Sequence, residues 1–284
     1  MRYSIILVFI FFSMNLDAQK LSIDNSDFFY QIAPIFDFKQ SIVSLTFDDG
    51  YISQFEIGIP LLKERNLSAT FYVITNSVDS LIKTIILGNK SDEFEIGSHT
   101  MTHPDLVKIG NEEAIKELLD SQLYLKNKFG EYAGLTLSYP WGIYNNSIKQ
   151  LAESYYLAAR SADVGYNSLV MLDKYALKMQ SFDEHTEVFK ADQWVDFSIK
   201  NHLWLIEMIH GIDNNGYSPV DSRTLIEHFD YIKKNEDNIW CTTVGTAVKY
   251  VDESRIAKVF CGDCNYYSRP KCLLNIGLNS KNNR

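Results

Sequence analysis

Two short segments carry side chains that could bind a metal ion and activate water. Residues 46–50 read Thr-Phe-Asp-Asp-Gly, and residues 98–104 read Ser-His-Thr-Met-Thr-His-Pro. Together they supply two adjacent carboxylates and two imidazoles spaced four positions apart. Two imidazoles and one carboxylate suit zinc, with water as the fourth ligand. Because the second carboxylate could then take a proton from that water, the two segments predict metal-assisted hydrolysis.

Each segment has a simpler interpretation when it is considered alone. Asp48 and Asp49 precede a glycine, which is common in turns, and His99 and His103 would share one side of a helical turn over 100–104. The placement of the carboxylates favours a site, because Phe47 ends an apolar strand and both acids would enter a cleft. An unpaired carboxylate is costly to desolvate, and coordination of a metal removes that cost.

The candidate functional residues lie at the ends of strands, in a chain whose predicted strands and helices alternate. We expect strands at 42–47, 69–74, 94–97, 135–139, 156–160, 204–209 and 239–244, and helices at 53–64, 111–129 (capped by Asn111) and 224–234. Alternating strands and helices favour a parallel sheet. Six side chains lie at or just past a strand's C-terminal end, namely Asp48, Asp49, His99, Trp141, Arg160 and His210.

This placement predicts an α/β fold, a distorted (β/α) barrel of seven or eight parallel strands in a single domain. The C-terminal ends of the strands form one face of such a barrel, and active sites lie there. An open doubly wound sheet is the alternative, and it would gather fewer strand ends into one cup.

The chain has 284 residues and a net charge of −9, which argues against nucleic acid as a partner. Residues 1–18 combine a positive start, an apolar run and a small residue, which is typical of a signal peptide. We therefore expect a secreted or periplasmic protein with no transmembrane segment. Residues 19–40 would be a lead-in, 41–251 the catalytic domain and 252–284 a cysteine-containing tail.

The four cysteines all lie in the last fifth of the chain, at Cys241, Cys261, Cys264 and Cys272. In an exported protein they are expected to form disulfides rather than a zinc knuckle. Four cysteines permit three pairings, and the spacing does not choose among them.

The two chemical segments resemble the polysaccharide deacetylases, the NodB-homology group also known as carbohydrate esterase family 4. The resemblance extends from about Ser41 to Val251. It implies that Asp48 is the catalytic base and that Asp49, His99 and His103 bind the metal, most commonly zinc. It also implies that His210, in the pair Ile-His, protonates the leaving group.

A third segment, Tyr139-Pro140-Trp141-Gly142, resembles the family motif that lines the substrate groove, where the Trp141 N–H would help to bind the oxyanion. Many members carry an arginine at the position of Ser138, and that arginine orients the base. In this chain Arg160 could supply the charge from the next strand, or it could pair with Asp163. Asp163 is also a candidate for orienting His210.

The remaining histidines and aromatic residues have no matching context. His185, His202 and His228 are expected on the surface or in helix packing. Trp141 is the aromatic residue that we expect to stack on a sugar ring, and Tyr166 and Tyr217 are weaker candidates.

These patterns predict a metal-dependent hydrolase that removes acetyl groups, chiefly N-acetyl groups, from an acetylated glycan. The bond hydrolysed would then be a C–N bond other than a peptide bond. An O-acetyl esterase of the xylan type would use the same site. A glycan-binding module without activity is a further alternative, and Ser138 is the only feature in its favour. A serine esterase is disfavoured because no Gly-x-Ser-x-Gly elbow occurs.

Overall fold

The structure is a computed structural model that describes residues 34–89 and 93–260. The expected signal peptide at 1–18 lies outside the described residues, as do Cys261, Cys264 and Cys272, so the disulfides stay a prediction. Among the residues that the structure describes, Cys241 has no disulfide partner.

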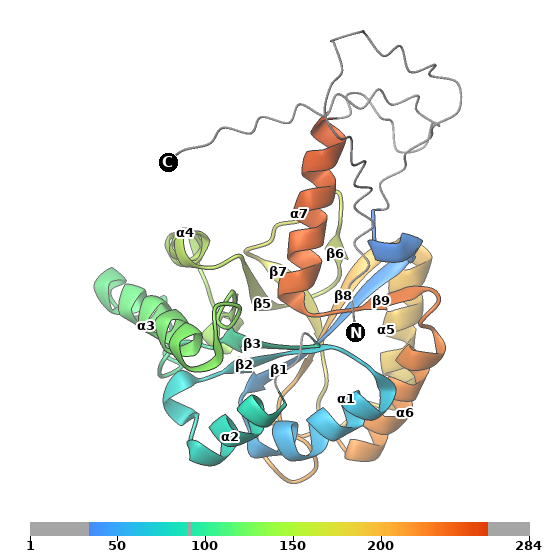
Figure 1. The fold of residues 1–284 in the computed structure, drawn as a ribbon, viewed down its shortest axis with the longest axis horizontal. Coiled ribbons are helices and arrows are strands. Elements are labelled where there is room, and N and C mark those ends of the chain that lie inside the picture. Colours follow the sequence, from blue (N-terminus) through green and yellow to red (C-terminus); the bar gives the residue numbers. More distant parts are fainter. Residues whose placement is uncertain (1–33, 90–92, 261–284) are drawn as a thin grey trace, which may run out of the picture. The chain divides into compact units, whose positions relative to one another are not determined.

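Seven parallel strands close into a barrel within the described residues (Figure 1). Their order is β1-β2-β3-β4-β5-β7-β8, and β8 pairs with β1 to complete the ring. The bounds are β1 (Ser41–Asp49), β2 (Ala69–Val73), β3 (Phe94–Ser98), β4 (Thr136–Ser138), β5 (Ala158–Val164), β7 (Leu177–Ser181) and β8 (Leu203–Ile209). The predicted barrel is therefore confirmed, although β7 was not among the expected strands.

Two further strands extend the sheet outside the ring. β6 (Asn167–Ser168) runs antiparallel to β8, and β9 (Ile239–Cys241) runs parallel to the start of β1. β5 continues to Val164, four residues past its expected end, so Arg160 lies inside this strand rather than at its tip.

The two faces of β1 have different chemistry. Val43, Leu45 and Phe47 belong to the hydrophobic core that β1 shares with the surrounding helices. The alternate residues Ser44 and Thr46 are polar, and each hydroxyl donates to a backbone carbonyl at 2.7 Å. Because successive side chains of a strand point to opposite faces, Asp48 continues the polar side at the strand's C-terminal end.

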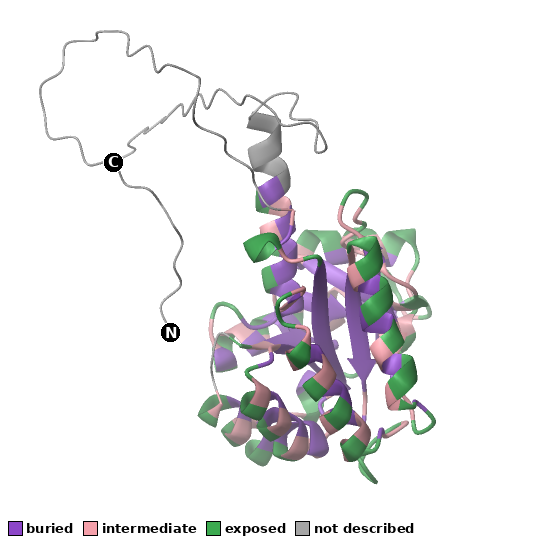
Figure 2. Cartoon of the chain, turned by 90° about the vertical axis from the view of Figure 1, so that its right-hand side faces the viewer, coloured by how far each residue is buried: buried purple, intermediate pink, exposed green. Residues whose placement is uncertain are grey.

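Helices surround the barrel, and their exposed residues face outward while the strands are buried (Figure 2). The bounds are α1 (Ile59–Arg65), α2 (Ser80–Gly88), α3 (Asn111–Phe129), α4 (Asn146–Tyr155), α5 (Val188–Asn201), α6 (Ser222–Lys234) and α7 (Val244–Phe260). Asp79, Asn145 and Asp221 cap α2, α4 and α6 by accepting backbone N–H groups. Asn111 was expected to cap α3, but it is the first helical residue and the N-cap position is Gly110.

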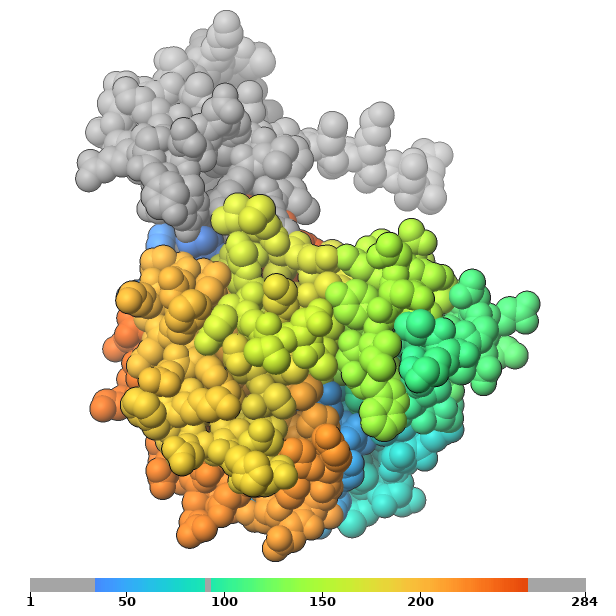
Figure 3. Space-filling view, turned by 180° about the vertical axis from the view of Figure 1, so that it is seen from behind, coloured from blue at the N-terminus to red at the C-terminus, as the bar shows by residue number. Residues whose placement is uncertain are grey.

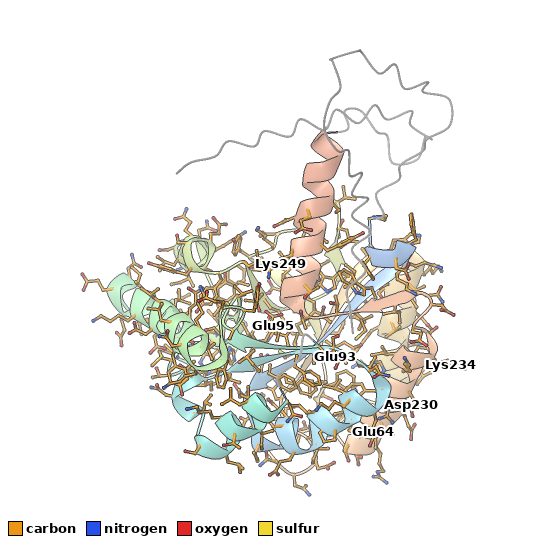
Figure 4. All side chains as sticks on the ribbon, viewed as in Figure 1. Glu64, Glu93, Glu95, Asp230, Lys234 and Lys249 are labelled. Atoms are coloured by element: carbon orange, nitrogen blue, oxygen red, sulfur yellow. The ribbon has the colours of Figure 1, made fainter. Side chains whose placement is uncertain are left out.

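Helix α7 begins against the barrel end opposite the chemical residues. The Glu95 carboxylate of β3 (labelled in Figure 4) accepts the Gly245 N–H at 2.8 Å and the Thr136 hydroxyl at 2.6 Å. A carboxylate is stabilising at a helix N-terminus because the peptide dipoles place partial positive charge there. Helix α7 runs across residue 251, where the sequence suggested a domain boundary. Within the described residues, none of the helices has the length and apolar character needed to cross a membrane.

A buried charged cluster joins α5 and α6 to β8. His228 Nδ1 lies 2.8 Å from Asp192, and its Nε2 lies 3.0 Å from Glu207. Burial alone would lower the pKa of His228, but the two carboxylates outweigh burial and raise the pKa to about 9. His228 is thus fully buried in helix packing, whereas His185 and His202 are exposed, as the sequence suggested.

Candidate active site and metal centre

Strand ends place four of the predicted site residues around one pocket. Asp48 and Asp49 end β1, His99 follows β3 directly, and His210 follows β8 directly. His103 reaches the same place from the loop after β3, but this loop is not the helical turn that the spacing suggested. The backbone of His103 is left-handed, with φ of 63°, and this conformation turns its ring back toward His99. Non-glycine residues in such conformations often occur at functional sites.

The candidate ligand atoms of Asp49, His99 and His103 lie within 4.8 Å of one another. The two histidine Nε2 atoms are 3.1 Å apart. The Asp49 Oδ1 atom is 3.5 Å from Nε2 of His99 and 3.8 Å from Nε2 of His103. One carboxylate and two imidazoles converging in this way form a suitable donor set for zinc.

The hydrogen bond on the far side of the His99 ring indicates which nitrogen faces the cluster with a lone pair. His99 Nδ1 is 2.8 Å from the Ser138 carbonyl oxygen. Because a carbonyl only accepts, Nδ1 carries a proton, and the neutral tautomer of this ring has its lone pair on Nε2, the nitrogen that faces Asp49. A lone pair opposite a carboxylate is repulsive unless a cation lies between them, so the residues present fit a metal ion. Metal-binding histidines commonly donate their second nitrogen in this way.

The ionisation states also suit a cation. Burial opposes the charge on Asp49, but His99 and the other nearby histidines outweigh burial and lower the pKa of Asp49 to about 2. Burial, and then the proximity of His99, lower the pKa of His103 to about 4. At neutral pH Asp49 is therefore a carboxylate and His103 is a neutral imidazole, and these are the forms that coordinate metals.

Asp48 occupies a different environment beside this cluster. It is 3% exposed, and its Oδ2 atom contacts the Arg160 guanidinium and, at 3.2 Å, the Ser138 hydroxyl. Burial raises the pKa of Asp48, but the lowering effect of Arg160, followed by that of the histidines, is larger. The pKa of Asp48 therefore lies below its ordinary value. Its Oδ1 atom has no hydrogen-bond partner among the described residues. An ionised carboxylate with one unoccupied oxygen can accept a proton.

The pairing of β4 with β5 explains how Arg160 reaches Asp48. Ser138 and Arg160 are direct cross-strand partners, and the guanidinium donates to the Ser138 hydroxyl at 2.6 Å. An arginine on β5 therefore delivers its charge next to Ser138, the position at which the family resemblance led us to expect an arginine on β4. The alternative partner, Asp163, instead accepts the Tyr144 hydroxyl at 3.4 Å.

His210 lies across the pocket from the candidate ligands. Its ring contacts Tyr217 at a centroid distance of 5.2 Å, and burial lowers its pKa. Its Nδ1 atom has no hydrogen-bond partner among the described residues, so the expected contact with Asp163 is not formed. Asp163 lies in β5, and its carboxylate is directed to Tyr144 instead.

These residues line a pocket of about 400 Å³. Figure 3 shows the side of the molecule where the early, blue part of the chain lies between light green and orange segments. Trp141 is 66% exposed at the pocket wall, and its ring lies 4.9 Å from that of His103. Tyr217 also lines the pocket, whereas Tyr166 packs on Phe197 and is absent from the lining.

The groove segment is held by a tight turn over 140–142. Tyr139 and Pro140 are both buried, and Tyr139 is among the residues that line the pocket. Gly142 has φ of 67°, and a β-carbon there would lie 2.2 Å from that of Ala162. The turn thus requires glycine, and it leaves Trp141 projecting beside the candidate ligands.

Two residues at this site had no signal in the sequence analysis. Tyr51 lines the pocket, and Gln54 lies buried beneath it with hydrogen bonds to Asp48 and His210. Both residues closely follow the Thr-Phe-Asp-Asp-Gly segment at 46–50. Only the path of the chain after β1 shows which way their side chains point.

Known structures share this fold. The Xyl-CE4 domain of a multidomain xylanase from the hindgut metagenome of Trinervitermes trinervoides superposes with a TM-score of 0.53 and 17% identity. The match covers 73% of this chain and 89% of that domain. The two chains therefore share the barrel fold.

Sequence comparison supports the resemblance noted from the motifs. Residues 37–159 match the polysaccharide deacetylase family. Peptidoglycan-N-acetylglucosamine deacetylase PgdA of Listeria monocytogenes is 34% identical over 115 residues, 39% of this chain and 23% of that protein. The bifunctional xylanase/deacetylase of Pseudobutyrivibrio xylanivorans is 24% identical over 215 residues, 71% of this chain and 33% of that protein. The chain thus matches a third or less of the length of these relatives.

Proposed function

We propose that this protein is a metal-dependent carbohydrate deacetylase that hydrolyses N-acetyl groups of a glycan polymer or oligosaccharide. One observation carries the proposal: the cluster of Asp49, His99 and His103 opens into the same pocket as Asp48 and His210. A ligand set, a base and an acid are the groups that hydrolysis of an amide requires. Zinc is the ion that this donor set favours.

Each residue has a distinct task in this proposal. Asp49, His99 and His103 would hold the ion, which when bound polarises an acetyl carbonyl and makes water more acidic. Asp48 takes the proton of the attacking water through its unoccupied oxygen, while Arg160 keeps the carboxylate ionised and oriented.

The opposite wall completes the reaction. His210 donates a proton to the departing sugar nitrogen, and the Trp141 N–H stabilises the developing oxyanion. The amides of Gly142 and Ile143 in the same turn already donate to Tyr139 and Pro140. The exposed indole of Trp141 provides an apolar face on which a pyranose ring can stack.

The same groups could remove an O-acetyl group, with His210 protonating a sugar oxygen instead. The name of the xylanase/deacetylase relative makes xylan the relevant ester substrate to compare. A module that binds glycan without hydrolysis has less support, because Arg160 supplies the charge whose absence at Ser138 suggested inactivity.

Acetate release tests the proposal directly. The purified chain would be loaded with zinc and incubated with acetylated poly-glucosamine, chitin oligosaccharides, peptidoglycan and acetylated xylan. We expect acetate from an N-acetylated glycan, and none after chelation of the metal. Binding of a glycan by the zinc-loaded protein without any acetate would contradict the hydrolase and favour the binding module.

The organisation of the chain is part of the proposal. Residues 41–251 would comprise the catalytic domain, and residues 1–18 would direct export to the periplasm or the exterior, where acetylated glycans occur. Secretion of a reporter fused to residues 1–18, compared with one fused to residues 19–40, measures this export signal.

A further inference from the structure

Gln54 joins the chain ends that carry the proposed base and the proposed acid. Its side chain is fully buried, and its amide Nε2 donates to the backbone carbonyl of Asp48 and, at 2.8 Å, to that of His210. An amide –NH₂ has two hydrogens, so one group can serve both carbonyls. We propose that Gln54 is a positioning residue that fixes the separation between Asp48 and His210, and this inference rests on the proposed function.

The ladder between β1 and β8 explains why such a residue is needed. The last paired residues of the two strands are Phe47 and Ile209. Asp48 directly follows Phe47, and His210 directly follows Ile209, so the proposed base and acid lie one position beyond the β1–β8 pairing. Asp48 is still paired with Tyr72 of β2, but the ladder no longer links it to β8, so a further link is needed to fix the distance between the two carbonyls.

The local backbone is adapted to direct Gln54 into this gap. Residues Gln54–Gly58 form the π-helical turn η2 rather than a regular α-helix. Such turns are rare and occur frequently at functional sites. The preceding Ser53 adds two bonds to the loop after β8, since its hydroxyl accepts the Ile212 N–H at 3.2 Å and its N–H donates to Asn215 at 3.3 Å.

The chain offers a matched control for the Gln54 amide. Gln122 in α3 is also buried, and its Nε2 donates to two backbone carbonyls, those of Gly134 and Tyr155. Neither glutamine lines the pocket, but the bonds of Gln122 reach neither the Asp48 nor the His210 carbonyl. Methionine preserves the length of either side chain but cannot donate, so Gln54→Met and Gln122→Met remove equivalent bonds at and away from the site.

The experiment measures kcat, KM, zinc content and thermal stability for wild type and both variants on the best acetylated substrate. For Gln54→Met we expect kcat to fall by about 10- to 100-fold, as misplacement of catalytic groups by about 1 Å does. KM and zinc content should change by less than about twofold, because neither substrate contacts nor ligands are removed. Gln122→Met should lose similar stability and keep kcat within about twofold of wild type.

Two outcomes would overturn the inference while leaving the proposed function intact. One is a Gln54→Met protein with wild-type kcat, and the other is an equal loss of kcat in both variants. A crystal structure of Gln54→Met gives a readout that does not depend on activity: we expect the Asp48 and His210 carbonyls to move apart, and unchanged positions would refute the role. If wild type releases no acetate from any substrate, the proposed function itself fails.

Discussion

Moving the arginine from β5 to β4 is a direct test of how the base is held. Arg160 is 1% exposed and contacts both Asp48 and Ser138, its cross-strand partner. We predict that Arg160→Ser impairs both stability and turnover, and that Ser138→Arg in the same chain restores part of each. The volume that Arg160 vacates lies next to position 138, so the new side chain has room to reach Asp48.

The expected size of the effect follows from the burial of the pair. Removing one partner of a buried ion pair costs about 3–5 kcal/mol, because the other charge stays desolvated. For a domain of about 200 residues, 1 kcal/mol corresponds to about 2–4 °C, so Arg160→Ser should lower the melting temperature by about 6–20 °C. Ser138→Arg alone should also destabilise, since it buries a second cation beside Arg160.

Thermal unfolding and acetate release on wild type, the two single variants and the double variant complete the cycle. We expect the double variant to exceed both singles in melting temperature and in kcat. An Arg160→Ser protein with wild-type turnover would refute the role of the charge. A double variant no better than Arg160→Ser would show that the charge cannot be supplied from β4.

Three further predictions address the base, the ion and the buried charged cluster. Asp48→Asn should reduce acetate release by about 100- to 10,000-fold while zinc content stays unchanged; near wild-type turnover would contradict its assignment as the base. Zinc should stabilise the metal-free protein by about 2.7 kcal/mol at 100 times its dissociation constant, and His103→Ala should abolish most of this gain, as differential scanning calorimetry would show. The raised pKa of His228 stabilises the fold below the unfolded value of 6.5, and this contribution is lost as the pH rises through about 9. The melting temperature should therefore fall between pH 6.5 and 9.5, and a His228→Phe, Glu207→Leu double variant should lack this decline; the same decline in both proteins would assign it to other groups.

Strong local patterns made most of the barrel predictable. β1 is a continuous buried run, and its position and the acids at its end follow from that run. β7 was missed because Leu-Lys-Met-Gln-Ser is short and half polar, with only two of its five residues buried. Such a strand forms because its neighbours β5 and β8 provide partners on both sides, and local sequence contains no record of those partners.

The site residues likewise include some that the sequence predicted and some that only the structure reveals. The spacing of His99 and His103 suggested a shared cation, although the loop reaches that arrangement through left-handed residues rather than a helical turn. Arg160 had two candidate partners, and only the register between β4 and β5 selects Asp48. The link from Gln54 could not be predicted, because it depends on where the barrel closes.

Closure of the ring by β1 and β8 has a consequence for biosynthesis. β1 cannot complete its pairing until β8 has been synthesised, because Phe47 pairs with Ile209. Contacts between such distant parts of a chain are slow to form during folding, because a long loop must close first. A growing polypeptide would therefore carry the candidate ligands long before the proposed active site could form, because that site is assembled only after His210 has been synthesised.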